Sequence, residues 1–125
     1  MRTMRFRTAL MCLVAASCAA PAPERSVGAS ELAGRTAGKP QQCVSLRPTE
    51  AIRLSDTDRH TLLYGSGRTI YANRLGECSF ARDDVLVTEP SGSYYCRGDL
   101  VRSFDRYSHI PGRSCVLGDF VPYSR

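Results

Sequence analysis

Six cysteines and two histidines are the side chains of this 125-residue chain that are best suited to chemistry. Four of the cysteines follow residue 42, and none of these stands in a Cys-x-x-Cys pair, a spacing that zinc sites favour. We therefore expect disulfide bonds and no metal ion. Four cysteines allow three pairings. We favour a nested pairing over a sequential one: Cys43 joined to Cys115 and Cys78 to Cys96, in place of Cys43 to Cys78 and Cys96 to Cys115.

The two histidines, His60 and His109, are the candidates for acid–base chemistry. A small secreted nuclease or hydrolase could use such a pair as general base and general acid, with arginine holding a phosphate. His60 lies beside Asp58 where a strand is expected to start, and His109 lies in the turn-like segment 108–112. Both contexts are typical of exposed histidines, and neither shows a third catalytic partner. Catalysis by this pair is the alternative hypothesis; the favoured one assigns no catalytic residue.

Other short motifs indicate turns. Residues 65–69, Gly-Ser-Gly-Arg-Thr, lack the Gly-Lys-Ser/Thr ending of a phosphate-binding loop. Residues 97–99, Arg-Gly-Asp, are typical of a turn that follows a bridged cysteine. The acidic pairs at 56/58 and 83/84 favour solvated loops over calcium binding. The sequence therefore predicts no cofactor.

Residues 1–18 are typical of a bacterial export signal. Three arginines lie among the first seven residues, an apolar run follows at residues 9–16, and small residues end the segment. The apolar run is too short to cross a bilayer, which needs about 20 residues. The sequence therefore predicts an exported protein.

The end of this signal allows two cleavage products. Residues 15–18, Ala-Ala-Ser-Cys, are similar to a bacterial lipobox, in which Cys18 carries lipid and becomes the N-terminus. Cleavage after Ala19, at a small-x-small site, would instead leave a soluble periplasmic or secreted protein. We favour lipidation, because a lone cysteine at the end of a signal has few other uses. The expected location is the periplasm, with the protein anchored through Cys18; with Ala19 after the anchor, the resemblance to sorted lipoproteins implies the outer membrane.

Two zones of different composition follow the signal. Residues 19–42 hold Ala, Gly, Pro, Ser and charge with almost nothing to bury, so we expect a disordered tether in which a short helix around 30–33 would have no role. Residues 43–125 form the predicted domain and carry 11 basic and 10 acidic side chains, well mixed. Such a surface disfavours nucleic-acid binding, although the whole chain has a net charge of +5.

The segment 43–125 alternates short apolar runs with turn residues, which is typical of β structure. Its best hairpin joins residues 61–64 to 68–72 through a turn with two glycines. Further strands are expected near 50–54, 85–88, 93–96, 99–104, 114–117 and 119–122. We predict an all-β domain, a small antiparallel barrel or sandwich of five to seven strands. Disulfides should staple it, because so small a core contributes only about 3–5 kcal/mol.

A series of short motifs spans the same segment. In chain order they are Cys43, Ile52-Arg53, Thr61-Leu62-Leu63, Gly67-Arg68-x-Ile70-Tyr71-x-Asn73-x-Leu75, Cys78, Cys96-Arg97-Gly98-Asp99 and Ser114-Cys115-x-Leu117-Gly118-x-Phe120-x-Pro122. This ordered set over residues 43–122 resembles a family of small exported proteins of Gram-negative bacteria, known only as a domain of unknown function. The resemblance implies an envelope location and four paired cysteines, and it implies no activity.

The aromatic residues include six tyrosines and no tryptophan. If several of Tyr64, Tyr71, Tyr94 and Tyr95 emerge on one face, they would form a binding surface. We therefore predict an exported, non-enzymatic envelope lipoprotein that binds a protein, glycan or other envelope component and meets the membrane through lipid on Cys18. The alternative is a small secreted hydrolase or nuclease that uses His60 and His109.

Overall fold

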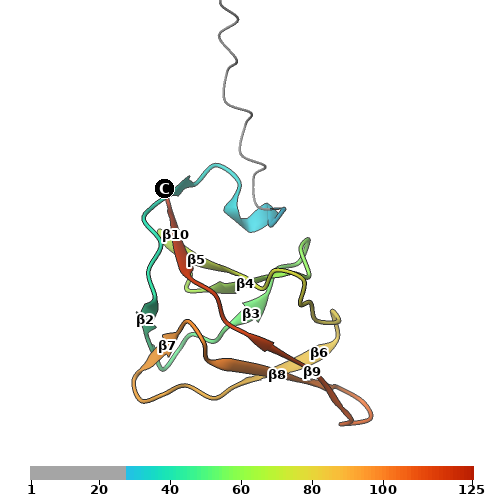
Figure 1. Ribbon diagram of the computed structural model, residues 1–125. Helices are drawn as coiled ribbons and strands as arrows, with labels where there is room; N and C mark the ends of the chain where they lie inside the picture. The colour runs from blue at the N-terminus through green and yellow to red at the C-terminus, as the bar shows by residue number, and fades with distance from the viewer. Residues whose placement is uncertain (1–27) are drawn as a thin grey trace, which may run out of the picture.

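The computed structural model describes residues 28–125 and is all-β, as predicted (Figure 1). The predicted export signal (1–18), the lipidation of Cys18 and tether residues 19–27 lie outside the described residues. The described residues form ten strands, more than the five to seven predicted, because four of them have only two or three residues and are too short to show a period in the sequence; the other six are at least four residues long. In chain order the elements are the 3-10 helix η1 (Ser30–Leu32), β1 (Thr36–Ala37), β2 (Cys43–Ser45), β3 (Arg53–Leu54), β4 (Thr61–Tyr64), β5 (Thr69–Arg74), β6 (Asp84–Thr88), β7 (Tyr94–Cys96), β8 (Leu100–Asp105), β9 (Pro111–Val116) and β10 (Phe120–Ser124).

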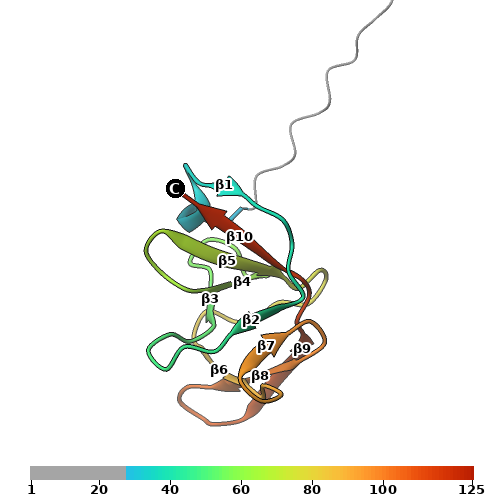
Figure 2. The ribbon, with the colours of Figure 1, turned by 90° about the vertical axis from the view of Figure 1, so that its left-hand side faces the viewer.

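The strands form three antiparallel sheets. Their strand orders are β1-β10-β5-β4-β3, β2-β7 and β6-β8-β9. Figures 1 and 2 show the five-stranded sheet at the end of the domain that carries the C-terminus, and the three-stranded sheet at the opposite end. The predicted hairpin is β4–β5, with Leu63 opposite Ala72. Gly65 and Gly67 in its turn have φ angles of 88° and 72°, a region that glycine adopts at little cost.

One buried cluster joins the three sheets. Leu62 and Tyr64 reach it from the five-stranded sheet, Tyr95 from β7, and Val101 and Cys115 from the three-stranded sheet. Each large apolar side chain buried in this way contributes about 1.5–3 kcal/mol to stability. The main core therefore depends on all three sheets at once.

A second buried cluster covers the other face of the five-stranded sheet. Ala29 and Leu32 of the N-terminal segment pack there with Leu63, Ile70 and Ala72. All four residues of β4 are buried as a result. The prediction of a disordered tether is therefore wrong for residues 28–42, and the helix around 30–33 has a role, because its leucine is core.

Specific polar contacts hold this segment in place. The Ser55 hydroxyl and the Asp56 N–H donate to the Glu31 carboxylate at 2.9 and 2.7 Å. The Arg35 guanidinium donates to two backbone carbonyls of the β4–β5 turn at 2.8 and 2.9 Å. Every one of these bonds spans more than 20 residues of sequence. A local count of apolar residues does not detect such contacts, which is why composition alone indicated a tether.

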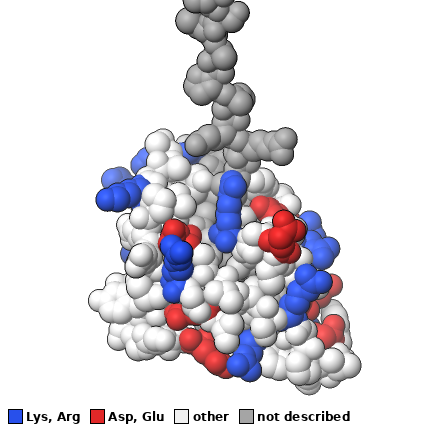
Figure 3. Space-filling model, in the orientation of Figure 1, with Lys and Arg blue, Asp and Glu red and all other residues white. Residues whose placement is uncertain are grey.

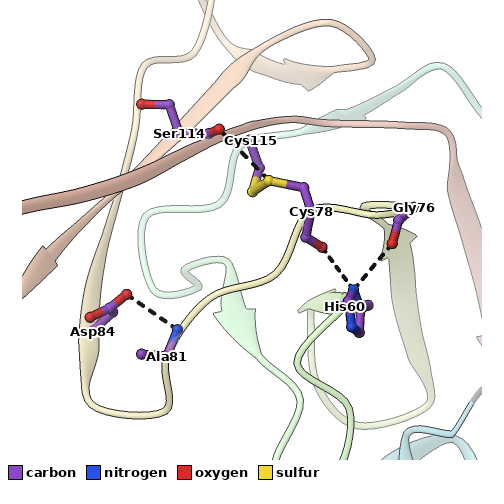
Figure 4. The surroundings of a disulfide bond; sticks show 7 residues. All are labelled: His60, Gly76, Cys78, Ala81, Asp84, Ser114 and Cys115. Atoms are coloured by element: carbon purple, nitrogen blue, oxygen red, sulfur yellow. Dashed lines mark hydrogen bonds between the residues drawn. A yellow bond between two sulfur atoms is a disulfide. The ribbon is translucent and has the colours of Figure 1, made fainter.

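Two disulfides link segments that are far apart in the sequence, and both predicted pairings are wrong. The bonds are Cys43–Cys96 and Cys78–Cys115, so they interleave along the chain. Strand pairing is the reason: Cys43 in β2 lies directly opposite Cys96 in β7, with the two Cα atoms 4.1 Å apart. Cys115 is buried on β9, and Figure 4 shows its bond to Cys78 on the loop between β5 and β6.

A buried amide ties β5 to the turn between β9 and β10. Asn73, which is 1% exposed, donates from its side chain to the Gly118 carbonyl and accepts from the Gly118 N–H, both at 2.8 Å. A Cβ at position 118 would lie 3.0 Å from the Arg74 carbonyl oxygen, so the turn needs glycine to come this close.

Candidate functional site

The outer face of the three-stranded sheet carries exposed aliphatic side chains. Val85 and Val87 of β6, Leu100 of β8 and Val116 of β9 are between 38% and 55% exposed. Register places them on one face, because directly opposed residues of antiparallel strands point to the same side. Val85 lies opposite the half-buried Phe104, and Leu100 lies opposite Val116. We call this surface the outer face of β6-β8-β9.

An arginine occupies the middle of this face. Arg102 lies opposite Val87 on one side and Ser114 on the other. Its Nε is 3.6 Å from Oε1 of Glu89, and both side chains are about half exposed. An exposed ion pair of this kind contributes little to stability, so Arg102 can readily leave Glu89 and bind a group on a partner protein. The outer face therefore offers two apolar rows with a cationic donor between them.

The inner side of the same sheet makes the outer face rigid. Val101 is fully buried and lies opposite Cys115, whose sulfur is bonded to Cys78. The β8–β9 pairing contains a register shift that sets Ser103 against the segment around Gly112, where a Cβ would collide with the Ser103 hydroxyl. Such bulges twist a sheet and fix the direction of its side chains.

The β8–β9 hairpin ends in a tip with two exposed apolar residues, Tyr107 (81%) and Ile110 (64%). His109 has a φ of 56°, and its N–H donates to the Asp105 carbonyl at 3.0 Å. The Asp105 carboxylate accepts from the Ser108 N–H and hydroxyl and from the Tyr107 N–H. These bonds hold the pKa of Asp105 below its ordinary value. His109 is thus a residue of a tight turn.

His60 has a different environment. Its Nδ1 lies 3.1 Å from the Gly76 carbonyl oxygen and 3.0 Å from that of Cys78, as Figure 4 shows. The His60 ring therefore contacts two backbone carbonyls of the turn at residues 76–78, which ends at the bridged Cys78. None of the described contacts brings His60 and His109 together, so the acid–base pair of the alternative hypothesis receives no geometric support.

Three of the four tyrosines considered for a binding surface lie in the main core or against it. Tyr64 is 2% exposed; its hydroxyl donates to the Ser45 carbonyl and accepts from the Arg47 N–H, both at 2.8 Å. Its ring centroid lies 5.3 Å from that of Tyr95, which is also buried, and 6.5 Å from that of the half-buried Tyr71. The four tyrosines therefore do not emerge together on one face: Tyr64, Tyr71 and Tyr95 pack at the main core, and Tyr94 is the one of the four that is exposed, at 51%.

The sequence contained one signal for the true apolar face, but an ambiguous one. Residues 85–87, Val-Leu-Val, are apolar on both faces of a strand, so alternation could not say which side is buried. The same doubt affected Leu100 and Val101, which are adjacent and point to opposite sides. Burial in the structure resolves both cases.

The turn carboxylates give the domain a predictable response to acid. Burial raises the pKa of Asp58, but hydrogen bonds from the Thr61 hydroxyl and the His60 N–H outweigh it, and the pKa lies below its ordinary value. A lowered pKa adds stability that is complete above the unfolded-state pKa and is lost as pH falls through the folded-state pKa. We expect the contribution of Asp58 to the free energy of unfolding to be complete above about pH 5 and to be lost below about pH 4.

Urea unfolding at several pH values checks this. The variant Asp58→Asn should be less stable than the parent at pH 7 and should lose less stability between pH 5 and 3. Parallel pH curves for the two proteins would contradict the assignment.

Neither surface charge nor metal-binding side chains indicate a further site in the part of the chain that the structure describes. Figure 3 shows acidic and basic side chains mixed over one face of the molecule. Residues 28–125 contain no group of three or more His, Cys, Asp or Glu side chains that could hold a metal ion. In that same range no helix has the length and apolar character needed to span a membrane.

No family model, no curated protein and no solved structure matches this chain.

Proposed function

We propose that this chain is a non-enzymatic binding protein of the bacterial envelope, exported by its N-terminal signal and anchored at the outer membrane through lipid on Cys18. The resemblance to small exported proteins of unknown function supports the location, and the two disulfides suit an oxidising compartment. The single observation that carries the binding role is the outer face of β6-β8-β9, an exposed apolar surface on a cross-linked support.

The chemistry of this face favours a protein partner over a glycan. Its exposed side chains are aliphatic, whereas sugar rings are usually held by aromatic stacking and several polar groups. Arg102 adds a planar donor that suits a carboxylate or a backbone carbonyl on a partner. Interfaces often combine such an arginine with apolar neighbours.

We also propose that the domain is a small sandwich, with the five-stranded and three-stranded sheets packed across the main core. The shared cluster supports this, because Leu62 and Phe120 from one sheet and Val101 from the other belong to it. In this arrangement the outer face is one of the two external surfaces of the sandwich, and residues 28–37 cover the other.

Site-specific photocrosslinking tests the binding role. A photoreactive amino acid is placed at Val87 or at Val116 in the full, lipidated chain in living cells, and at Ser66 in the β4–β5 turn as a matched exposed control. Both positions on the outer face should give the same partner adduct, and Ser66 should give none. Adducts of equal yield from all three positions, or none from the outer face, would overturn the proposal.

A second variant separates binding from folding. Arg102→Glu should abolish the adduct at Val116 while leaving the urea midpoint nearly unchanged, because both Arg102 and its partner Glu89 are exposed. Retention of the adduct would show that the face does not recognise its partner through this cation.

A further inference from the structure

Strand β6 has a free backbone edge. It is an outer strand of its sheet and pairs only with β8 among residues 28–125. The Glu89 N–H donates to the Leu100 carbonyl at 3.4 Å just beyond the strand. Because bonded and non-bonded residues alternate in antiparallel pairs, the odd-numbered residues of β6 turn their backbone groups toward β8. The even-numbered residues turn theirs toward the free edge. Among residues 28–125 the backbone groups of Leu86 and Thr88 have no partner at this edge, whereas the Asp84 N–H donates to the Ala81 carbonyl at 3.2 Å.

This edge lacks the features that usually block pairing with another chain. The opposite edge of the sheet, β9, carries Pro111, an adjacent register shift and Arg113, all of which oppose strand addition. The edge strands β1 and β3 have only two residues each. Between Asp84 and Thr88, by contrast, β6 has no proline, lysine or arginine. Among residues 28–125, β6 is therefore the longest edge strand without such a feature.

We propose that β6 pairs antiparallel with β6 of a second copy, about a two-fold axis through Leu86. In this register Leu86 faces its own equivalent, Val85 faces Val87, and Asp84 faces Thr88. The backbone directions agree with this register, because the even-numbered residues that point to the free edge meet one another. Leu86 can exchange N–H···O bonds with its own equivalent, and the Thr88 N–H can donate to the Asp84 carbonyl of the second copy; the Asp84 N–H stays bonded to Ala81. Two valines from each copy then form one apolar patch, and no like charges face each other within the strand.

The pairing also has a consequence for the size of the apolar face. Three strands about 4.8 Å apart and about six residues long present roughly 300 Å², well below the roughly 800 Å² that a stable partner covers. Joining two copies produces one six-stranded sheet and doubles that face. The inference does not rest on the proposed function, because the edge is defined by the backbone of β6 alone.

Charged residues just beyond the two ends of β6 affect how strongly the two copies associate. In each copy the Glu89 carboxylate is 3.6 Å from Nε of Arg102. In the same register Asp83 lies opposite Glu89 of the second copy. This like-charged pair weakens the contact slightly and is screened by salt. Association through β6 should therefore hold or strengthen as the salt concentration rises.

Disulfide trapping tests the register. Val85→Cys and Val87→Cys are made separately, and peptide mapping first verifies the two native disulfides. On mild oxidation, the mixture of the two variants should form cross-linked dimers faster than either variant alone, because residues 85 and 87 face each other at a non-bonded position. Equal rates in all three samples would indicate random collision and overturn the proposal.

Sedimentation measures the association itself, with the exported full chain as sample. The dissociation constant should rise at least about tenfold in Val87→Lys, because a lysine on an edge strand opposes pairing. It should be unchanged in the matched control Val116→Lys, which lies on the same outer face but on β9. A protein that stays monomeric up to about 1 mM, or one that responds equally to both lysines, overturns pairing through β6. If Val116→Lys loses the photocrosslinked adduct with the partner but still dimerises, pairing through β6 is unaffected. That result would show that only partner binding depends on this part of the outer face of β6-β8-β9.

Discussion

Replacing Cys78 with Ser and Cys115 with Ala together is expected to lower the free energy of unfolding by about 4 kcal/mol. The bond spans 37 residues, so its loss returns a large amount of chain entropy to the unfolded state. Cys115 is also 2% exposed, and its sulfur is part of the main core. Because domains of this size are stable by only about 5–15 kcal/mol, the loss removes a large share of the total. Urea unfolding followed by circular dichroism measures it.

The second bond provides the matched comparison. Cys43→Ser with Cys96→Ser opens a 53-residue link, for which chain entropy again predicts about 4 kcal/mol. Cys43 is exposed, so this variant should lack the added loss of burial. Removing both bonds should abolish cooperative unfolding. A loss below about 1 kcal/mol in either pair would show that the sheets hold together without the cross-links.

Asn73→Ala is expected to cost about 2–4 kcal/mol. The substitution removes a buried side chain together with both of its hydrogen bonds to the half-buried Gly118, and a polar group left without its partner in such a place costs about 1–3 kcal/mol. The effect should appear as a lower urea midpoint with an unchanged slope. The slope should hold because the surface exposed on unfolding does not change.

A neighbouring hydrogen bond between side chains serves as the control for this prediction. The Thr69 and Ser124 hydroxyls are 2.9 Å apart on β5 and β10, and both residues are only partly buried. Water can replace the lost bond in Ser124→Ala, so the expected cost is below about 1 kcal/mol. Equal losses in the two variants would mean that Asn73 stabilises the domain no more than a half-exposed hydroxyl does.

Local signals in the sequence were enough for the strand-rich class and for one hairpin. The β4–β5 turn was predictable because glycine is the residue that adopts positive φ most readily, and both turn glycines do so. The three-stranded sheet was partly predictable from β-branched runs. Strands such as β1 and β3 were not, because a two-residue strand has no period and exists through its partner alone.

Contacts between distant residues account for what local signals missed. The disulfide pairing follows from β2 lying beside β7, and nothing in the spacing of the cysteines specifies that neighbour. Leu32 looked isolated in a polar stretch, yet Leu63 and Ile70 complete its environment. The sequence left the place of the tyrosines open, because this residue type suits both a surface and a core, and only packing distinguishes the two.

The interleaved disulfides have a consequence for how the domain responds to proteolysis. The four cysteines divide the chain between Cys43 and Cys115 into three intervals, and each interval is bridged by at least one bond. One peptide cut in any interval, or one cut in each of any two, leaves all fragments covalently joined. A nested pairing would release its middle piece after cuts in both outer intervals. Nicked protein should therefore keep its fragments together, gaining only the mass of one water per cut until thiols are added.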